Sequence, residues 1–186
     1  MQNEHVQITP CASPDDAIRG RFLSDDRAAA GEARAYVARF SYRMLNRSKA
    51  PLDEVGVLFD LMSGGNYPES TPSAQVVSRP LPFSPHVGAS GAVCLGESWR
   101  LSQGQQLLGE LVVHVARLLN LDEPNPASLD GFDPDALSYW RTVLHGRPLN
   151  PGLRLPEVPV DLVYGLERQR VMRIATQARS GLRRVS

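Results

Sequence analysis

The residue of this sequence with the clearest chemical potential is a cysteine in a loop rich in proline and glycine. Residues 82–96 read PFSPHVGASGAVCLG, with Cys94 near the end of the loop. A buried structural cysteine more usually lies within an apolar strand or helix, so this context predicts an open, stiffened turn that presents the side chain. A thiolate can accept an acyl group and hold it as a thioester, which is activated toward amines. We therefore interpret Cys94 as a candidate nucleophile.

Four other residues are weighed as partners of this thiol. His86 lies eight residues before Cys94, and its imidazole N–H is suited to stabilise an oxyanion or to help deprotonate an incoming amine; the alternative is a turn residue that caps backbone carbonyls. His114 is interpreted as a core or boundary histidine, and Cys11 as an inert thiol. Asp130 is a possible accessory residue that orients or deprotonates an attacking lysine, although its loop also resembles the approach to a helix N-cap, which we favour.

Composition limits the class of protein. The chain has 186 residues, 42% of them apolar, which suits one domain with a single core. Its 20 basic and 20 acidic residues cancel, so we expect neither nucleic acid nor a membrane as a partner. The polar start lacks the apolar segment of a signal peptide, and no apolar run approaches a membrane span. Two cysteines without a CxxC pair predict reduced thiols and a cytoplasmic location, and four scattered histidines predict no metal site and no cofactor.

The pattern of apolar residues predicts an α+β fold. Residues 1–12 are expected to form a flexible tail, and Ser13 is expected to begin a helix that runs to about residue 33. Strict alternation predicts three strands joined as an antiparallel meander, at residues 35–44, 55–61 and 73–79. After the cysteine loop, the spacing predicts helices at about residues 102–120, 133–146 and 161–179. We expect a core over residues 1–147, with residues 148–186 as a proline-rich link and C-terminal helix that extend the same domain.

A series of short motifs, taken together, resembles the ubiquitin-conjugating enzyme family. The family's pattern is Tyr-Pro, then His-Pro-Asn, then a glycine three residues before the active cysteine, then tryptophan, a long helix and Pro-Asn-Pro. The corresponding residues here are Tyr67-Pro68, Ser84-Pro85-His86, Gly91, Cys94, Trp99 and Pro124-Asn125-Pro126. The resemblance covers roughly residues 13–145. It implies a ubiquitin-conjugating-like fold, with an N-terminal helix, a meander, a cysteine loop and C-terminal helices.

The resemblance also implies an activity. Cys94 would accept a ubiquitin-like modifier as a thioester from an activating enzyme and transfer it to an amine of a target protein. His86 stands where the family has an asparagine that supports the oxyanion, and the acidic residue usual just beyond Pro-Asn-Pro is absent. These departures are typical of a divergent, bacterial relative.

Two other classes of function remain open. In one, the chain is a non-catalytic binding module with the same fold, which the lost asparagine favours and the retained Cys94 opposes. In the other, Cys94 forms a cysteine hydrolase dyad with His86 or His114, although the sequence supplies no clear third group to orient the histidine. Of the three, we expect the conjugating enzyme.

Overall fold

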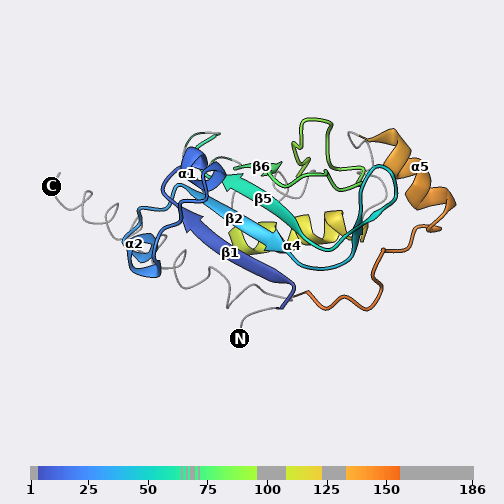
Figure 1. Cartoon of the computed structure of the whole chain (residues 1–186), viewed down its shortest axis with the longest axis horizontal. Coiled ribbons are helices and arrows are strands. Elements are labelled where there is room, and N and C mark those ends of the chain that lie inside the picture. The colour runs from blue at the N-terminus through green and yellow to red at the C-terminus, as the bar shows by residue number, and fades with distance from the viewer. Residues whose placement is uncertain are drawn as a thin grey trace, which may run out of the picture.

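The computed structural model combines a four-stranded antiparallel sheet with short helices (Figure 1). It describes residues 4–63, 65, 67, 70, 72–95, 108–122 and 133–155. The elements are β1 (Val6–Cys11), α1 (Pro14–Ile18), α2 (Asp25–Ala29), β2 (Ala35–Phe40), β3 (Met44–Leu45), β4 (Pro51–Leu52), β5 (Val55–Asp60), β6 (Ser73–Val76), α4 (Leu108–Leu119) and α5 (Pro134–Thr142). The predicted α+β class is therefore confirmed.

The main sheet has the strand order β1-β2-β5-β6, and every neighbouring pair is antiparallel. Its central register places Ala38 of β2 between Ile8 of β1 and Val57 of β5. The predicted meander of three strands corresponds to β2, β5 and β6 and is confirmed. The strand predicted over residues 35–44 ends earlier, at Phe40, and Met44 instead belongs to the small β3–β4 ladder, in which it pairs with Leu52.

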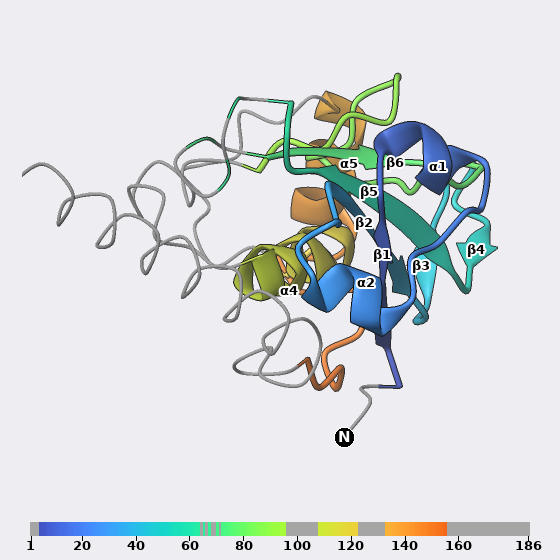
Figure 2. The same cartoon turned by 90° about the vertical axis from the view of Figure 1, so that its left-hand side faces the viewer.

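One face of the sheet forms the core together with α4 (Figure 2). The alternation of apolar residues predicts which side chains of the first two predicted strands face inward. All of them are buried: Tyr36, Ala38, Phe40, Tyr42, Met44, Val55, Val57, Phe59 and Leu61. The apolar stripe predicted for the long helix includes Leu107, which lies outside the described residues, and five residues that are buried: Leu108, Leu111, Val115, Leu118 and Leu119. Tyr42 donates its hydroxyl hydrogen to the Ala116 carbonyl of α4 at 2.6 Å. The inward-facing side chains of the strands and the apolar stripe of α4 therefore pack together in one core.

The expectation of a flexible tail over residues 1–12 is wrong for residues 6–11. These residues form β1, whose whole length pairs with β2 and whose Val6 is buried in the core. Pro10 is compatible with this strand because β1 lies at the edge of the sheet, where a residue can lack an N–H without breaking a ladder. The fold therefore begins with a strand rather than with the N-terminal helix that the family resemblance implies.

The single helix expected over residues 13–33 is replaced by the two short helices α1 and α2. The predicted start is correct: the Ser13 hydroxyl accepts a hydrogen bond from the Asp16 amide, and Pro14 occupies the first turn. Gly20 follows with a φ of +68°, a left-handed conformation that ends a helix. The predicted helix is thus interrupted after one turn by a glycine inside its own span.

The predicted capped helix over residues 133–146 corresponds to α5. The carboxylate of Asp133 accepts hydrogen bonds from the amides of Asp135 and Ala136, as an N-cap does. Gly146 closes the segment at a φ of +74°, with its amide bonded to the Trp140 carbonyl at 3.0 Å. The helix predicted at about residues 161–179 lies outside the described residues. Within the described part of the chain, no helix is long and apolar enough to cross a membrane.

Candidate functional site

Cys94 lies at the end of a tight hairpin formed by residues 86–94. Val87 and Val93 form an antiparallel bridge, and the Gly91 amide closes the turn onto the Gly88 carbonyl at 2.9 Å. The Cys94 amide donates to the His86 carbonyl at 2.8 Å. Cys94 therefore stands directly opposite His86 in the register of the hairpin. In an antiparallel pair, directly opposite residues are close neighbours on one face.

The hairpin is attached to the edge of the main sheet. Ala92 bridges Gln75 of β6, the Val76 amide donates to the Gly91 carbonyl at 2.8 Å, and the Val93 amide donates to the Ala74 carbonyl at 2.9 Å. The segment leading to Cys94 thus continues the sheet beyond β6. A cysteine placed in this way is held by a rigid element rather than by an unsupported loop.

Gly91, three residues before Cys94, is required by the backbone. Its φ is +94°, and a Cβ atom at this position would lie 2.9 Å from the Val76 carbonyl oxygen. Both the left-handed conformation and the close approach of β6 select glycine. The glycine at the family's spacing therefore has a physical role in docking the cysteine hairpin to the sheet.

Cys94 is a partly exposed residue. Its neighbours Val93 and Leu95 are both buried to 8% exposure, while Cys94 itself is intermediate and is not in a disulfide. The prediction of a presented side chain is correct in that the residue is not sealed in the core. The turn is also stiffened, as predicted, because sheet pairing holds it, but it is less open than expected, because the side chains of Val93 and Leu95 are buried.

Cys11 has the opposite environment. It is 0% exposed at the end of β1, in a small cluster with Ala35 and Leu58 that Ala17 of α1 packs against. Burial raises the pKa of the Cys11 thiol to about 11, and the nearby Asp16 carboxylate adds to the shift. A thiol with this pKa is protonated at neutral pH, which agrees with the interpretation of Cys11 as inert.

His86 is fixed by its backbone to the end of α4. Its amide donates to the Ser84 hydroxyl oxygen at 3.3 Å, and that hydroxyl donates to the Leu118 carbonyl at 3.0 Å. His86 is 3% exposed and Ser84 is fully buried. The segment that stands in place of His-Pro-Asn is thus tied to α4 on one side and, through the His86 carbonyl, to Cys94 on the other.

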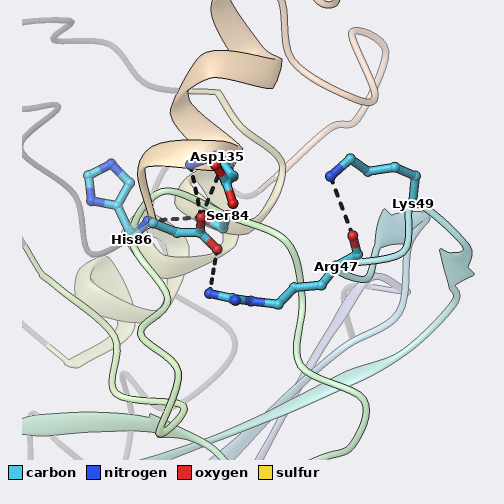
Figure 3. A network of polar contacts seen from close by, with 7 residues as sticks. Arg47, Lys49, Ser84, His86 and Asp135 are labelled. Atoms are coloured by element: carbon cyan, nitrogen blue, oxygen red, sulfur yellow. Dashed lines mark hydrogen bonds and ion pairs between the residues drawn. The ribbon is translucent and has the colours of Figure 1, made fainter.

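Asp133 extends this network to α5 and to the β3–β4 turn. Figure 3 shows Ser84 and His86 of the network beside Asp135 of α5 and Arg47 of the turn. The backbone amide of Asp133 donates to the Pro85 carbonyl at 3.2 Å, one carboxylate oxygen caps α5, and the other accepts from the Arg47 guanidinium at 2.8 Å. The carboxylate is only 4% exposed, so the guanidinium and the two amide donors offset the cost of burying its charge. Asp133 was predicted as a helix cap; its contact with the cysteine-proximal segment gave no signal in the sequence, because Pro85 contributes only a backbone carbonyl.

Lys49, the only lysine in the chain, lies on the β3–β4 turn beside this network. Its ammonium is 3.4 Å from the centroid of the Phe83 ring and 5.4 Å from that of Tyr139, and it donates to the Arg47 carbonyl at 3.3 Å. A cation over an aromatic face is attracted by the negative face of the ring. The ammonium group of Lys49 therefore interacts with two aromatic rings and a backbone carbonyl of its own chain.

His114, which lies on α4, reaches the residue that follows Cys94. The Nε2 atom of His114 lies 3.1 Å from the Leu95 carbonyl oxygen. The interpretation as a boundary histidine is correct as far as its intermediate exposure goes. The contact with Leu95 agrees with a satisfied histidine, although the apolar spacing around residue 114 does not reveal which distant backbone carbonyl it would meet.

Several residues of the sequence interpretation are not among those described. Asp130, Trp99, Pro68 and residues 124–126 lie outside the described residues, and Tyr67 is buried. Among the described residues, no group of three or more histidine, cysteine, aspartate or glutamate side chains is arranged to hold a metal ion.

Comparison with known proteins finds no family model that matches this chain and no curated protein with significant sequence similarity to it. The chemistry of the site is therefore inferred from its own residues. Those residues are a partly exposed cysteine, a histidine opposite it, and a rigid hairpin that joins them.

Proposed function

We propose that this protein is a conjugating enzyme of the ubiquitin-conjugating type, in which Cys94 carries a ubiquitin-like modifier as a thioester. The observation that supports it most is the contrast in exposure between the two thiols. Cys94 is partly exposed on a hairpin docked to the sheet, whereas Cys11 is sealed under α1. The proposal also draws on the motif resemblance around Cys94, although β1 before the helices departs from the element order which that resemblance implies.

The proposed reaction has two acyl transfers. The Cys94 thiolate attacks the thioester carbonyl of the modifier on an activating enzyme, and that enzyme's thiolate leaves. A target amine then attacks the Cys94 thioester, so that an amide forms, the amine loses a proton, and the Cys94 thiolate is released. Both steps pass through a tetrahedral oxyanion, and each needs the sulfur to reach another protein.

In this proposal the rigidity of the hairpin has a catalytic purpose. The Cys94 amide is bonded to the His86 carbonyl, and Gly91 and Val93 are bonded to β6. Preorganised backbone lets the thiol meet a large acyl donor without first ordering a loop, which avoids an entropic cost at the transition state.

The role proposed for His86 is stabilisation of the oxyanion, as the resemblance implies. Its position opposite Cys94 supports this role. If the proposal is right, His86→Ala will slow discharge of the thioester to lysine more than it slows loading. Equal effects on both steps would assign the His86 ring a purely structural role.

A second candidate is a non-catalytic binding module of the same fold. The 3% exposure of His86 favours it, because a buried ring has to move before it can reach an acyl group bound at Cys94. The two candidates differ in one simple property: only the enzyme forms a covalent adduct.

The experiment is to mix the full-length chain with a cognate activating enzyme, ATP and modifier, and to separate the products on a non-reducing gel. The proposal predicts an adduct that thiol reagents remove, that Cys94→Ala abolishes and that the matched control Cys11→Ala retains. An adduct that survives Cys94→Ala would reject the proposal, and absence of any adduct from the native chain would favour the binding module.

A further inference from the structure

The hydrogen bond between His114 and the Leu95 carbonyl determines which ring nitrogen of the histidine carries a proton. A carbonyl oxygen only accepts hydrogen bonds, so the Nε2 atom at 3.1 Å must carry the proton. That proton stays in place whether the imidazole is neutral or charged. Nε2 therefore cannot serve as a base for the Cys94 thiol while this bond is intact.

This bond holds the carboxyl side of the candidate nucleophile. Leu95 directly follows Cys94 and is buried to 8% exposure. On the amino side, the Cys94 amide is bonded to the His86 carbonyl at 2.8 Å. The peptide group before Cys94 is thus fixed by the hairpin, and the carbonyl of the next residue, Leu95, is fixed by a side chain of α4.

The helix that supplies His114 is a rigid support. Leu111 and Leu118, which lie three and four positions from His114, are buried in the main core, as is its neighbour Val115. A donor mounted on such a helix restricts the carbonyl that it binds more than a donor on a loop does.

We infer that His114 is a positioning residue for Cys94, acting through the Leu95 carbonyl. This inference rests on the proposed function, in that the residue being positioned is the acyl-carrying nucleophile. The ring contributes a hydrogen-bond donor and takes no proton from the thiol. It restrains the chain where residues 94 and 95 leave the sheet.

The test compares two substitutions of similar size. His114→Gln keeps an N–H donor at a similar reach, whereas His114→Met has no donor. Hydrogen exchange of the Cys94 amide is measured in the full-length chain, at a temperature where circular dichroism shows each variant folded. We expect His114→Met to speed exchange about tenfold and His114→Gln to remain within about twofold of the native rate. Similar rates in His114→Met and the native chain, or equal acceleration in both variants, would overturn the inference.

Tyr42→Phe is a matched control for loss of a bond to α4. It removes the hydrogen bond to the Ala116 carbonyl without touching Leu95. We expect it to lower the melting temperature without selectively speeding exchange at Cys94. A selective change at Cys94 in this control would contradict a specific role for His114.

Thioester loading gives the second readout. We expect His114→Met to load the modifier several-fold more slowly and His114→Gln to restore most of the rate. Hydrogen exchange needs no activating enzyme, so it decides the role of His114 even if the native chain forms no adduct. If the native chain forms no adduct, that result counts against the proposed function. If His114→Met exchanges its Cys94 amide and loads the modifier at the native rates, that result counts against the inference alone.

Discussion

The two cysteines of this chain lie on the same sheet system in opposite environments. Cys11 ends an edge strand and is sealed by Ala17 of α1, with no exposed surface and a pKa raised to about 11. Cys94 ends a hairpin docked beyond β6 and is partly exposed. The residue type is the same, so the difference in reactivity has to come from what surrounds each sulfur. Strand pairing alone does not bury a thiol; a covering helix does.

The largest expected difference is in the rate of alkylation. At neutral pH a thiol with a pKa of about 11 has about a hundredfold less thiolate than one at the ordinary value of 9.0, and burial also blocks the reagent. We expect iodoacetamide to modify Cys94 at least about a hundredfold faster than Cys11 in the native chain. Peptide mass spectrometry measures both rates in one sample. Comparable rates would show that the two environments are not distinct.

The second test disturbs only the Cys94 side. Gly91→Ala adds a Cβ atom 2.9 Å from the Val76 carbonyl in a left-handed conformation, and we expect it to lower the free energy of unfolding by about 2 to 3 kcal/mol. Gly31→Ala is the matched control, since Gly31 has a φ of +85° but no atom within 4 Å of the added carbon. Urea unfolding of both variants separates the cost of the clash from that of backbone strain. Equal losses would show that docking on β6 is unimportant.

The third test weakens the support beneath His86. Ser84→Ala removes the acceptor for the His86 amide and the donor to Leu118 in a fully buried position. We expect a loss of about 2 kcal/mol in the free energy of unfolding, together with faster hydrogen exchange of the Cys94 amide. Hydrogen exchange at the amides of β1, which contains Cys11, should become faster only by the amount that the lower free energy of unfolding accounts for. Selective loosening of β1 instead would contradict the assignment of Ser84 to the Cys94 region.

The smallest expected effect concerns Cys11 and alkaline pH. Its pKa is raised in the folded state, so the folded chain keeps a proton that the unfolded chain releases. Stability from this group is therefore complete below its ordinary value of 9.0 and is lost as pH rises toward 11. We expect the native chain to lose roughly 1 kcal/mol more than Cys11→Val does between pH 7 and pH 10, measured by urea unfolding at each pH. Identical pH dependence in the two proteins would show that Cys11 is not sealed.

The predictability of the fold follows from which interactions are local. Alternation at Tyr36 to Phe40 and at Val55 to Leu61 identified β2 and β5, because inward and outward positions differ in polarity. The edge strand β1 was missed because Pro10 and neighbouring polar residues weaken the pattern, and its identity depends on pairing with a distant strand. Gly20 was present in the expected first helix, but only its left-handed backbone shows that it ends α1.

The site was predictable to a different degree. The proline and glycine content of residues 82–96 singled out the turn that carries Cys94, and the spacing of Gly91 and Cys94 was part of the family resemblance. The bonds that hold the hairpin were not predictable, because they join Asp133 to Pro85 and His114 to Leu95 through backbone carbonyls. A carbonyl is present at every residue, so nothing in the sequence identifies which one is bound.

The most direct test of the central claim, that the sulfur of Cys94 carries the acyl group, is to replace that sulfur by oxygen. In the presence of activating enzyme, ATP and modifier, Cys94→Ser should accumulate an adduct that resists thiol reagents and is cleaved by mild alkali, as an ester is. Cys11→Ser, with the native residue at position 94, should keep the thiol-sensitive adduct. If Cys94→Ser instead gave the same thiol-sensitive adduct as the native chain, the acyl group would be carried elsewhere and the account would be contradicted.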